Sequence, residues 1–200
     1  MIAPLRPFAF VAALAMATSL QAQETTTDTE EAPAPATSGI SMGTTVVEGR
    51  ALGEEYVLEE HGDWVLRCIT TEEEQDPCQL YQLLLDEAGN SVAEISMFPL
   101  NNGGEAVAGG TIITPLSTLL TAQVSLRVDS GATRRYPFTF CTAEGCFSRV
   151  GFTADDIASM KRGAAGTLTI VPAGSPDARV NLTVSLTGFT AGYDSLDARQ

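Results

Sequence analysis

The chain has 200 residues, 44% of them hydrophobic, and a formal net charge of −14 at pH 7, which suits one globular domain with a tail. Lys161 is the one lysine. Binding to nucleic acid backbones requires many lysines and arginines, so nucleic acid is excluded as a partner. The negative charge also opposes docking on an anionic lipid surface and favours solubility.

Residues 1–22 are predicted to be a signal peptide that is cleaved after Ala22. Arg6 precedes an apolar run at 8–17, and small residues follow the run, which is the pattern of such a segment. The run is shorter than the roughly 20 residues that span a bilayer. We therefore predict no transmembrane segment in the mature chain and expect the protein in the periplasm or secreted. A buried N-terminal helix is the alternative.

Residues 23–45 are rich in threonine, alanine, proline and acidic residues and contain few large apolar side chains. Such a segment cannot bury enough surface to offset the entropy of ordering it, so we predict a disordered acidic linker. The folded domain is expected at 46–200, with its core at about 61–196. Residues 46–60 are interpreted as a transition into the first strand.

Within this domain apolar residues mostly recur at every second position, which is the period of β-strands. The clearest example is 180–187, VNLTVSLT, where valine and leucine alternate with asparagine, threonine and serine. The turn sequences EAGN and TAEG predict hairpins at 78–99 and 134–152. Further strands are expected at 62–69, 106–114, 123–129 and 166–172.

One short helix is predicted at 152–163, FTADDIASMKRG. Thr153 and Asp156 have the spacing of a capping box, in which two side chains satisfy the first backbone N–H groups of a helix. Ile157 and Met160 are expected to face a sheet. Many short strands with one short helix predict an all-β fold, an antiparallel β-sandwich of the immunoglobulin-like kind.

The four cysteines occur as two pairs, Cys68-x9-Cys78 and Cys141-x4-Cys146. An even number of cysteines in an exported chain indicates disulfides, and four cysteines allow three pairings. Local pairing is favoured because each pair brackets a turn-like stretch, TTEEEQDP or TAEG. A zinc site and a redox pair are the alternatives, but neither spacing contains the close Cys-x-x-Cys pair that these sites commonly use.

His61 is the one histidine, and a catalytic histidine must face a nucleophile and be held by a carboxylate. No nucleophile motif accompanies His61, so we interpret it as a solvated loop residue and keep an enzyme that uses it as the alternative. Helix capping explains the adjacent carboxylates of Asp155 and Asp156, and Trp64 is expected in the core. We predict no catalytic residue, no metal ligand and no cofactor.

Six segments occur in an order and spacing that resemble a known family. They are GDWVLRC at 62–68, DPCQLYQ at 76–82, ITPLSTLLTAQVSLRVDSG at 113–131, FTFCTAEGC at 138–146, MKRG at 160–163 and VSLTGFTAGYDSL at 184–196. They are similar to the invasion-associated locus B family of exported bacterial proteins, over most of 61–196. The resemblance implies a periplasmic or envelope-associated β-sandwich with no assigned catalytic residues. It also implies a link to host-cell entry, since one member promotes red-cell invasion.

Together these observations predict a non-catalytic binding module of the cell envelope or of an interaction with a host. Its partner is expected to be a protein or another envelope component, and the sequence leaves its identity and the oligomeric state open. The alternative is a periplasmic ligand-binding or inhibitor domain. That alternative predicts an exposed apolar groove lined by Tyr81, Phe98 or Phe147.

Overall fold

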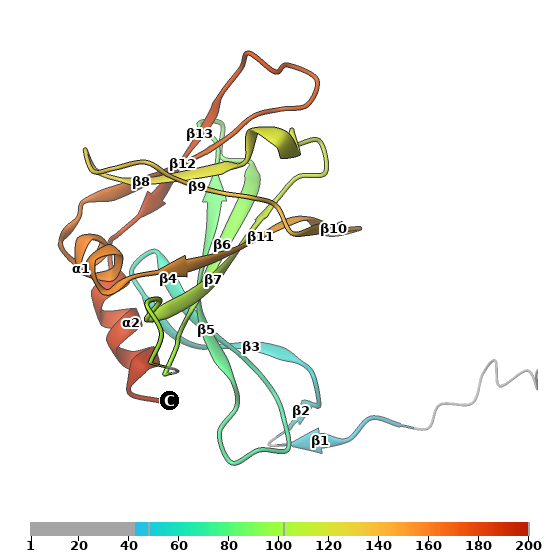
Figure 1. Cartoon of the computed structure of the whole chain (residues 1–200). Coiled ribbons are helices and arrows are strands. Elements are labelled where there is room, and N and C mark those ends of the chain that lie inside the picture. The colour runs from blue at the N-terminus through green and yellow to red at the C-terminus, as the bar shows by residue number, and fades with distance from the viewer. Residues whose placement is uncertain (1–42, 48, 102, 200) are drawn as a thin grey trace, which may run out of the picture. The chain divides into compact units, whose positions relative to one another are not determined.

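The computed structural model describes residues 43–47, 49–101 and 103–199 (Figure 1). The predicted signal peptide, its cleavage site and most of the predicted linker lie outside the described residues. The elements in chain order are β1 (Val46–Val47), β2 (Arg50–Ala51), β3 (Glu55–His61), β4 (Trp64–Ile69), β5 (Cys78–Leu85), β6 (Ser91–Pro99), β7 (Ala108–Thr114), the 3-10 turn η1 (Leu120–Ala122), β8 (Val124–Val128), β9 (Arg134–Tyr136), β10 (Phe140–Thr142), β11 (Gly145–Phe152), α1 (Ala154–Arg162), β12 (Ala165–Ile170), β13 (Val180–Ser185) and α2 (Phe189–Asp197). Within this part of the chain, neither helix is long and apolar enough to cross a membrane.

The strands form two main antiparallel sheets, as the sequence predicts. The large sheet has seven strands in the order β10-β11-β7-β6-β5-β4-β3, and the small sheet has four in the order β13-β12-β8-β9. A separate short ribbon pairs β1 with β2. Strand β3 precedes the region expected as the core, yet it pairs with β4 along most of its length and forms one edge of the large sheet.

Alternating apolar residues from both sheets meet in one hydrophobic core, and both helices contribute to it. Trp64 is fully buried, which confirms its predicted place in the core. Its indole Nε1 donates a hydrogen bond to the carbonyl oxygen of Ser185 at 2.7 Å, and its ring meets the ring of Phe189 edge-on with centroids 5.3 Å apart. The buried amide of Gln82 on β5 also binds the Ser185 backbone, so polar contacts join the large sheet to the end of β13.

Two glycines from opposite ends of the fold come into backbone contact. Gly188 has a positive φ of 83°, and a Cβ built there would lie 1.9 Å from the carbonyl oxygen of His61. Gly62, with φ 59°, faces Thr187 in the same way at 2.8 Å. Only glycine fits these positions, because a side chain would both strain the backbone and overlap the neighbouring chain. The GDW and SLTGF segments, far apart in the sequence, therefore meet at one tight contact.

The predicted helix is confirmed as α1. Thr153 caps it with the predicted capping box, because its side chain accepts from Asp156 N and the Asp156 carboxylate accepts from Thr153 N. The expectation of a single helix is wrong, since Phe189–Asp197 forms α2. Gly192 lowers the helix propensity of that segment, but a Cβ at Gly192 would lie 2.6 Å from the Leu80 side chain, so packing against β5 requires this glycine.

The prediction of one hairpin over 134–152 is partly wrong. Residues 134–136 form β9 in the small sheet, whereas 140–142 form β10 and pair with β11 in the large sheet. Pro137 lies between them, and proline has no N–H to offer to a strand ladder. Its carbonyl oxygen accepts a hydrogen bond from Ser148 Oγ at 2.8 Å. The chain thus passes from one sheet to the other at this proline, which leaves β9 free to face α1.

Candidate binding cleft

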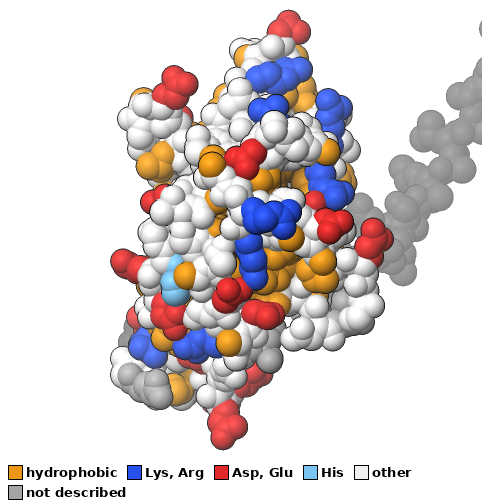
Figure 2. Space-filling view, turned by 90° about the vertical axis from the view of Figure 1, so that its left-hand side faces the viewer, with side chains coloured by type: hydrophobic (Ala, Val, Ile, Leu, Met, Phe, Trp, Pro, Cys, Tyr) orange, Lys and Arg blue, Asp and Glu red, His pale blue; other side chains and the backbone are white. Residues whose placement is uncertain are grey.

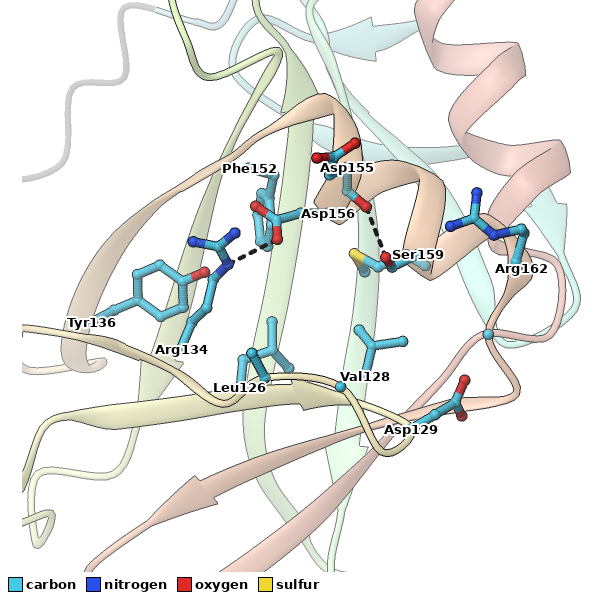
Figure 3. A pocket seen from close by; sticks show the side chains of 14 residues that line it. Leu126, Val128, Asp129, Arg134, Tyr136, Phe152, Asp155, Asp156, Ser159 and Arg162 are labelled. Carbon is cyan, nitrogen blue, oxygen red and sulfur yellow. Dashed lines mark hydrogen bonds and ion pairs between the residues drawn. The ribbon is translucent and has the colours of Figure 1, made fainter.

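A cleft of about 430 Å³ lies between β8, the β8–β9 turn, β9 and α1; we call it the β9–α1 cleft (Figure 3). The walls of the cleft come from segments that are separate in the sequence. They meet because β11 contacts β9, and α1 follows directly after β11. The residues that line it are Leu126, Val128, Asp129, Gly131, Ala132, Arg134, Tyr136, Phe152, Asp155, Asp156, Ser159, Met160, Arg162 and Gly163.

The floor of the β9–α1 cleft is apolar. Leu126 points inward from β8, Phe152 ends β11, and Met160 lies on the buried face of α1; none of them is more than 5% exposed. Tyr136 and Val128 are half-buried beside them. Figure 2 shows hydrophobic side chains at the middle of one face of the molecule, bordered by basic and acidic side chains. The cleft therefore offers an apolar surface that solvent reaches.

Charged side chains of both signs form the rim. Arg134 Nε donates to Asp156 Oδ1 at 2.8 Å across the mouth of the cleft (Figure 3). Asp156 is held in place because its other oxygen accepts from Thr153 N at 2.9 Å in the capping box. The guanidinium of Arg134 is half exposed, so the ion pair orients the rim but contributes little to stability. Asp155 and Arg162 are exposed on the helical side of the same rim.

Tyr136 gives the cleft a polar group above its apolar floor. Burial raises the pKa of this phenol above its usual value of 10.0, and the negative charge of Asp156 raises it further. The hydroxyl therefore stays neutral at physiological pH and can both donate and accept a hydrogen bond. The described lining contains carboxylates, guanidinium groups and hydroxyls, with neither histidine nor cysteine. Such a lining can offer charged and neutral hydrogen-bonding groups to a molecule in the cleft.

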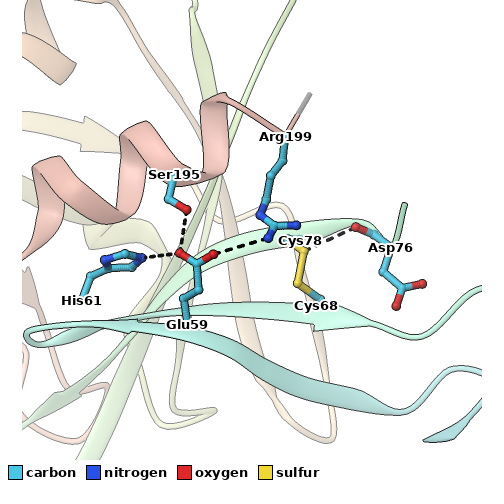
Figure 4. A network of polar contacts seen from close by, with 7 residues as sticks. All are labelled: Glu59, His61, Cys68, Asp76, Cys78, Ser195 and Arg199. Carbon is cyan, nitrogen blue, oxygen red and sulfur yellow. Dashed lines mark hydrogen bonds and ion pairs between the residues drawn. A yellow bond between two sulfur atoms is a disulfide. The ribbon is translucent and has the colours of Figure 1, made fainter. Parts of the chain in front are cut away.

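The histidine weighed as a catalytic residue lies elsewhere, in a polar network that joins β3 to α2 (Figure 4). His61 Nε2 contacts Glu59 Oε2 at 2.9 Å, and Ser195 Oγ donates to that same oxygen at 2.6 Å. Arg199 Nη2 reaches Glu59 Oε1 at 3.4 Å. The carboxylate thus sits between the imidazole and the hydroxyl, whereas an activated serine needs the imidazole beside its own oxygen.

Glu59 is the centre of this network. The pKa of Glu59 lies below its usual value of 4.5, chiefly because Ser195 donates a hydrogen bond to the carboxylate and also because His61 does so; the charge of Arg199 lowers it further. Three of the groups around the carboxylate therefore favour its ionised form. We interpret the network as a polar attachment of the C-terminal helix to the edge of the large sheet.

The cysteines form the two local pairs that the turn-like stretches favour. Cys68 and Cys78 are disulfide-bonded across β4 and β5 with Cα atoms 4.0 Å apart, and Cys141 and Cys146 are bonded across β10 and β11 at the same distance. No free cysteine remains in the chain. Among the described residues, no group of three or more histidine, cysteine, aspartate or glutamate side chains is arranged to hold a metal ion.

The aromatic residues proposed to line a groove share the outer face of the large sheet but lie on separate cross-strand rows. Tyr81 is opposite Ser96, Phe98 is opposite Gly109, and Phe147 is opposite Ile113. Each is engaged locally. The Tyr81 hydroxyl donates to Glu94 at 2.7 Å, and the guanidinium of Arg67 lies over the Tyr81 ring. The Phe98 ring covers Gly109. Phe147 stacks on Phe140 with ring centroids 4.8 Å apart. The three side chains do not make a common groove.

The sequence analysis identified some residues of the β9–α1 cleft but did not predict the cleft itself. The strand expected at 123–129 contains Leu126 and Val128, and the helical pattern placed Met160 toward a sheet. Arg134 and Tyr136 were missed as site residues because their segment was assigned to the first strand of the hairpin predicted at 134–152. The contact between Arg134 and Asp156, which are 22 residues apart, depends on the small sheet and has no local signal.

Comparisons with known proteins agree with this fold. Two proteins called invasion protein B homolog, from Brucella abortus strain 2308 and from Brucella abortus biovar 1 strain 9-941, are each 26% identical over 146 residues, which is 73% of this chain and 82% of theirs. The crystal structure of invasion associated protein b from Bartonella henselae matches with a TM-score of 0.59 and 25% identity, over 70% of this chain and 95% of that one. A family model described as Invasion associated locus B (IalB) protein matches residues 64–197. The chain therefore belongs to the invasion-associated locus B family.

Proposed function

We propose that this chain is an exported protein of the periplasm or outer envelope that acts as a non-catalytic binding module and takes its partner in the β9–α1 cleft. Membership of a family named for invasion supports a role at the envelope. The two disulfides support export, because disulfides form and persist in oxidising compartments. The partner is a protein or another envelope component that presents an apolar group.

The lining of the β9–α1 cleft is the observation that carries this proposal. Ligand pockets typically enclose about 300–1,000 Å³ and combine apolar walls with a few placed polar groups, and the cleft has about 430 Å³ with an apolar floor. The apolar floor gives affinity by removing a partner side chain from water. Arg134, Asp156 and the neutral hydroxyl of Tyr136 fix the orientation of the group that enters.

A photo-crosslinking residue tests the cleft directly. Ala132 on the rim is exposed, and Ala88 in the β5–β6 turn is an exposed control position. We expect defined adducts in envelope fractions when the crosslinker replaces Ala132, and none when it replaces Ala88. A second substitution, Ser159→Trp, fills the cleft and removes the adducts. Equal adducts from both positions, or adducts that persist with Ser159→Trp, would refute a role for the cleft.

Export is tested separately by fractionation and mass determination. The expected result is a mature chain that begins at Gln23, in the periplasmic or secreted fraction, with all four thiols oxidised. A cytoplasmic protein that retains residues 1–22, or that titrates as four free thiols, would contradict the proposed location. This outcome leaves the crosslinking result interpretable, so the two parts of the proposal can fail independently.

A further inference from the structure

The outer face of the small sheet carries mainly polar and basic side chains in a chain that is strongly acidic. The alternation that buries Leu126, Leu168 and Leu182 turns their neighbours outward. The outward residues are Ser125 and Arg127 on β8, Arg135 on β9, Ala165, Thr167 and Thr169 on β12, and Asn181, Thr183 and Ser185 on β13. None of them is acidic, although the chain holds 25 aspartates and glutamates against 11 lysines and arginines.

The side chains on this face align in rows across the strands. Arg135 is paired with Ser125, Ser125 with Thr169, and Thr169 with Asn181. Neighbouring strands lie about 4.8 Å apart, so each row presents polar groups at intervals close to the length of a sugar ring. Thr169 Oγ1 donates to Asn181 Oδ1 at 2.7 Å, which directs the Asn181 amide N–H groups outward as donors.

The face is also hollowed. A depression is lined by Arg127, Thr133, Thr167, Thr169 and Asn181. Its lining consists of one guanidinium, three hydroxyls and one amide, with no apolar side chain. Such a surface gives little driving force for binding an apolar group. It suits a ligand that is covered with hydroxyl groups.

Arg127 and Arg135 supply an unbalanced positive charge beside the depression. Elsewhere in the described chain Arg67, Arg134 and Arg199 form ion pairs with carboxylates. Arg127 and Arg135 are exposed and pair with no carboxylate among the described residues. They are diagonal neighbours on adjacent strands, about 7–8 Å apart at this kind of position. Their mutual repulsion is relieved by an anion that contacts both guanidinium groups.

We propose that the outer face of the small sheet binds an acidic polysaccharide whose sugar rings carry carboxylates. One carboxylate lies between Arg127 and Arg135, and the ring hydroxyls lie over Thr133, Thr167, Thr169 and Asn181. This surface is separate from the β9–α1 cleft, so its occupation does not depend on the cleft.

Binding of the full mature protein to polygalacturonate tests this proposal. Neutral dextran is the control for sugar rings without charge, polyglutamate is the control for carboxylates without rings, and phosphatidylglycerol vesicles are the control for an anionic lipid surface. We expect saturable binding to polygalacturonate that weakens with salt, and at least about tenfold weaker binding to each control. Equal binding to polygalacturonate and polyglutamate would overturn recognition of sugar, and preferred binding to vesicles would make the face a lipid site.

Matched variants locate the site. Arg127→Gln and Arg135→Gln are each expected to weaken polygalacturonate binding about tenfold, the effect of one charge-assisted hydrogen bond. Arg149→Gln removes the same charge from an exposed position on β11 and is expected to leave binding within about twofold. Thr169→Val keeps the shape of the side chain and should weaken polygalacturonate binding without changing binding to polyglutamate. Equal effects of Arg127→Gln and Arg149→Gln would overturn the proposed site.

Discussion

The contact between Gly188 and the β3–β4 turn predicts a large loss of stability for Gly188→Ala. The backbone φ of 83° costs a residue with a Cβ about 1–2 kcal/mol. The added Cβ would also lie 1.9 Å from His61 O, so the turn must move and the Asp63 N–Thr187 O hydrogen bond is disrupted. Overpacking of this kind costs about 1–3 kcal/mol. The expected total is about 2–5 kcal/mol, a large fraction of the 5–15 kcal/mol that stabilises a typical domain.

Gly89→Ala is the matched control. Gly89 has nearly the same φ, 84°, but a Cβ there has no atom within 4 Å. It carries the backbone cost alone, about 1–2 kcal/mol, so the difference between the two variants measures the close approach. Urea unfolding of the oxidised protein is followed by the fluorescence of Trp64, the one tryptophan, which packs on Phe189 directly after Gly188. Equal losses from both variants would refute the tight contact.

Three further predictions use the same unfolding assay. Gln82→Ala removes an amide that makes three part-buried hydrogen bonds to the backbones of Asp63 and Ser185; at about 1 kcal/mol for each bond we expect a loss of about 3 kcal/mol, and a loss below about 1 kcal/mol would contradict it. Replacing both Cys141 and Cys146 with alanine opens a short loop and should cost about 2 kcal/mol, with no loss expected if the bridge is not formed. The pKa of Glu59 is lowered in the folded protein, so its stabilising contribution is fully present above pH 4.5 and is lost as the pH falls through the folded value. The difference in unfolding free energy between the native protein and Glu59→Gln should therefore shrink below pH 4.5, and a difference that is constant with pH would contradict this assignment.

The GDW and SLTGF segments carried the family resemblance, and the structure gives them a packing role. Gly62 and Gly188 allow two chain segments to touch. Trp64, two residues after Gly62, packs against Phe189, the residue after Gly188. These residues fix how the C-terminal helix closes the core. The proposed binding surfaces lie elsewhere, although two of the other segments that carried the resemblance, 113–131 and 160–163, supply part of the lining of the β9–α1 cleft.

Local patterns in the sequence were sufficient for most of the strands, for α1 and for the pairing of the cysteines. Alternation in 180–187, the capping box at Thr153 and Asp156, and the turn between Cys141 and Cys146 each involve neighbours within a few residues, so their physical cause is visible in the sequence. Only the tertiary structure decided that 134–136 joins the small sheet, that Phe189–Asp197 is a helix and that Arg134 meets Asp156. These outcomes depend on which distant segments exclude water together, and helix propensity and periodicity carry no information about that choice.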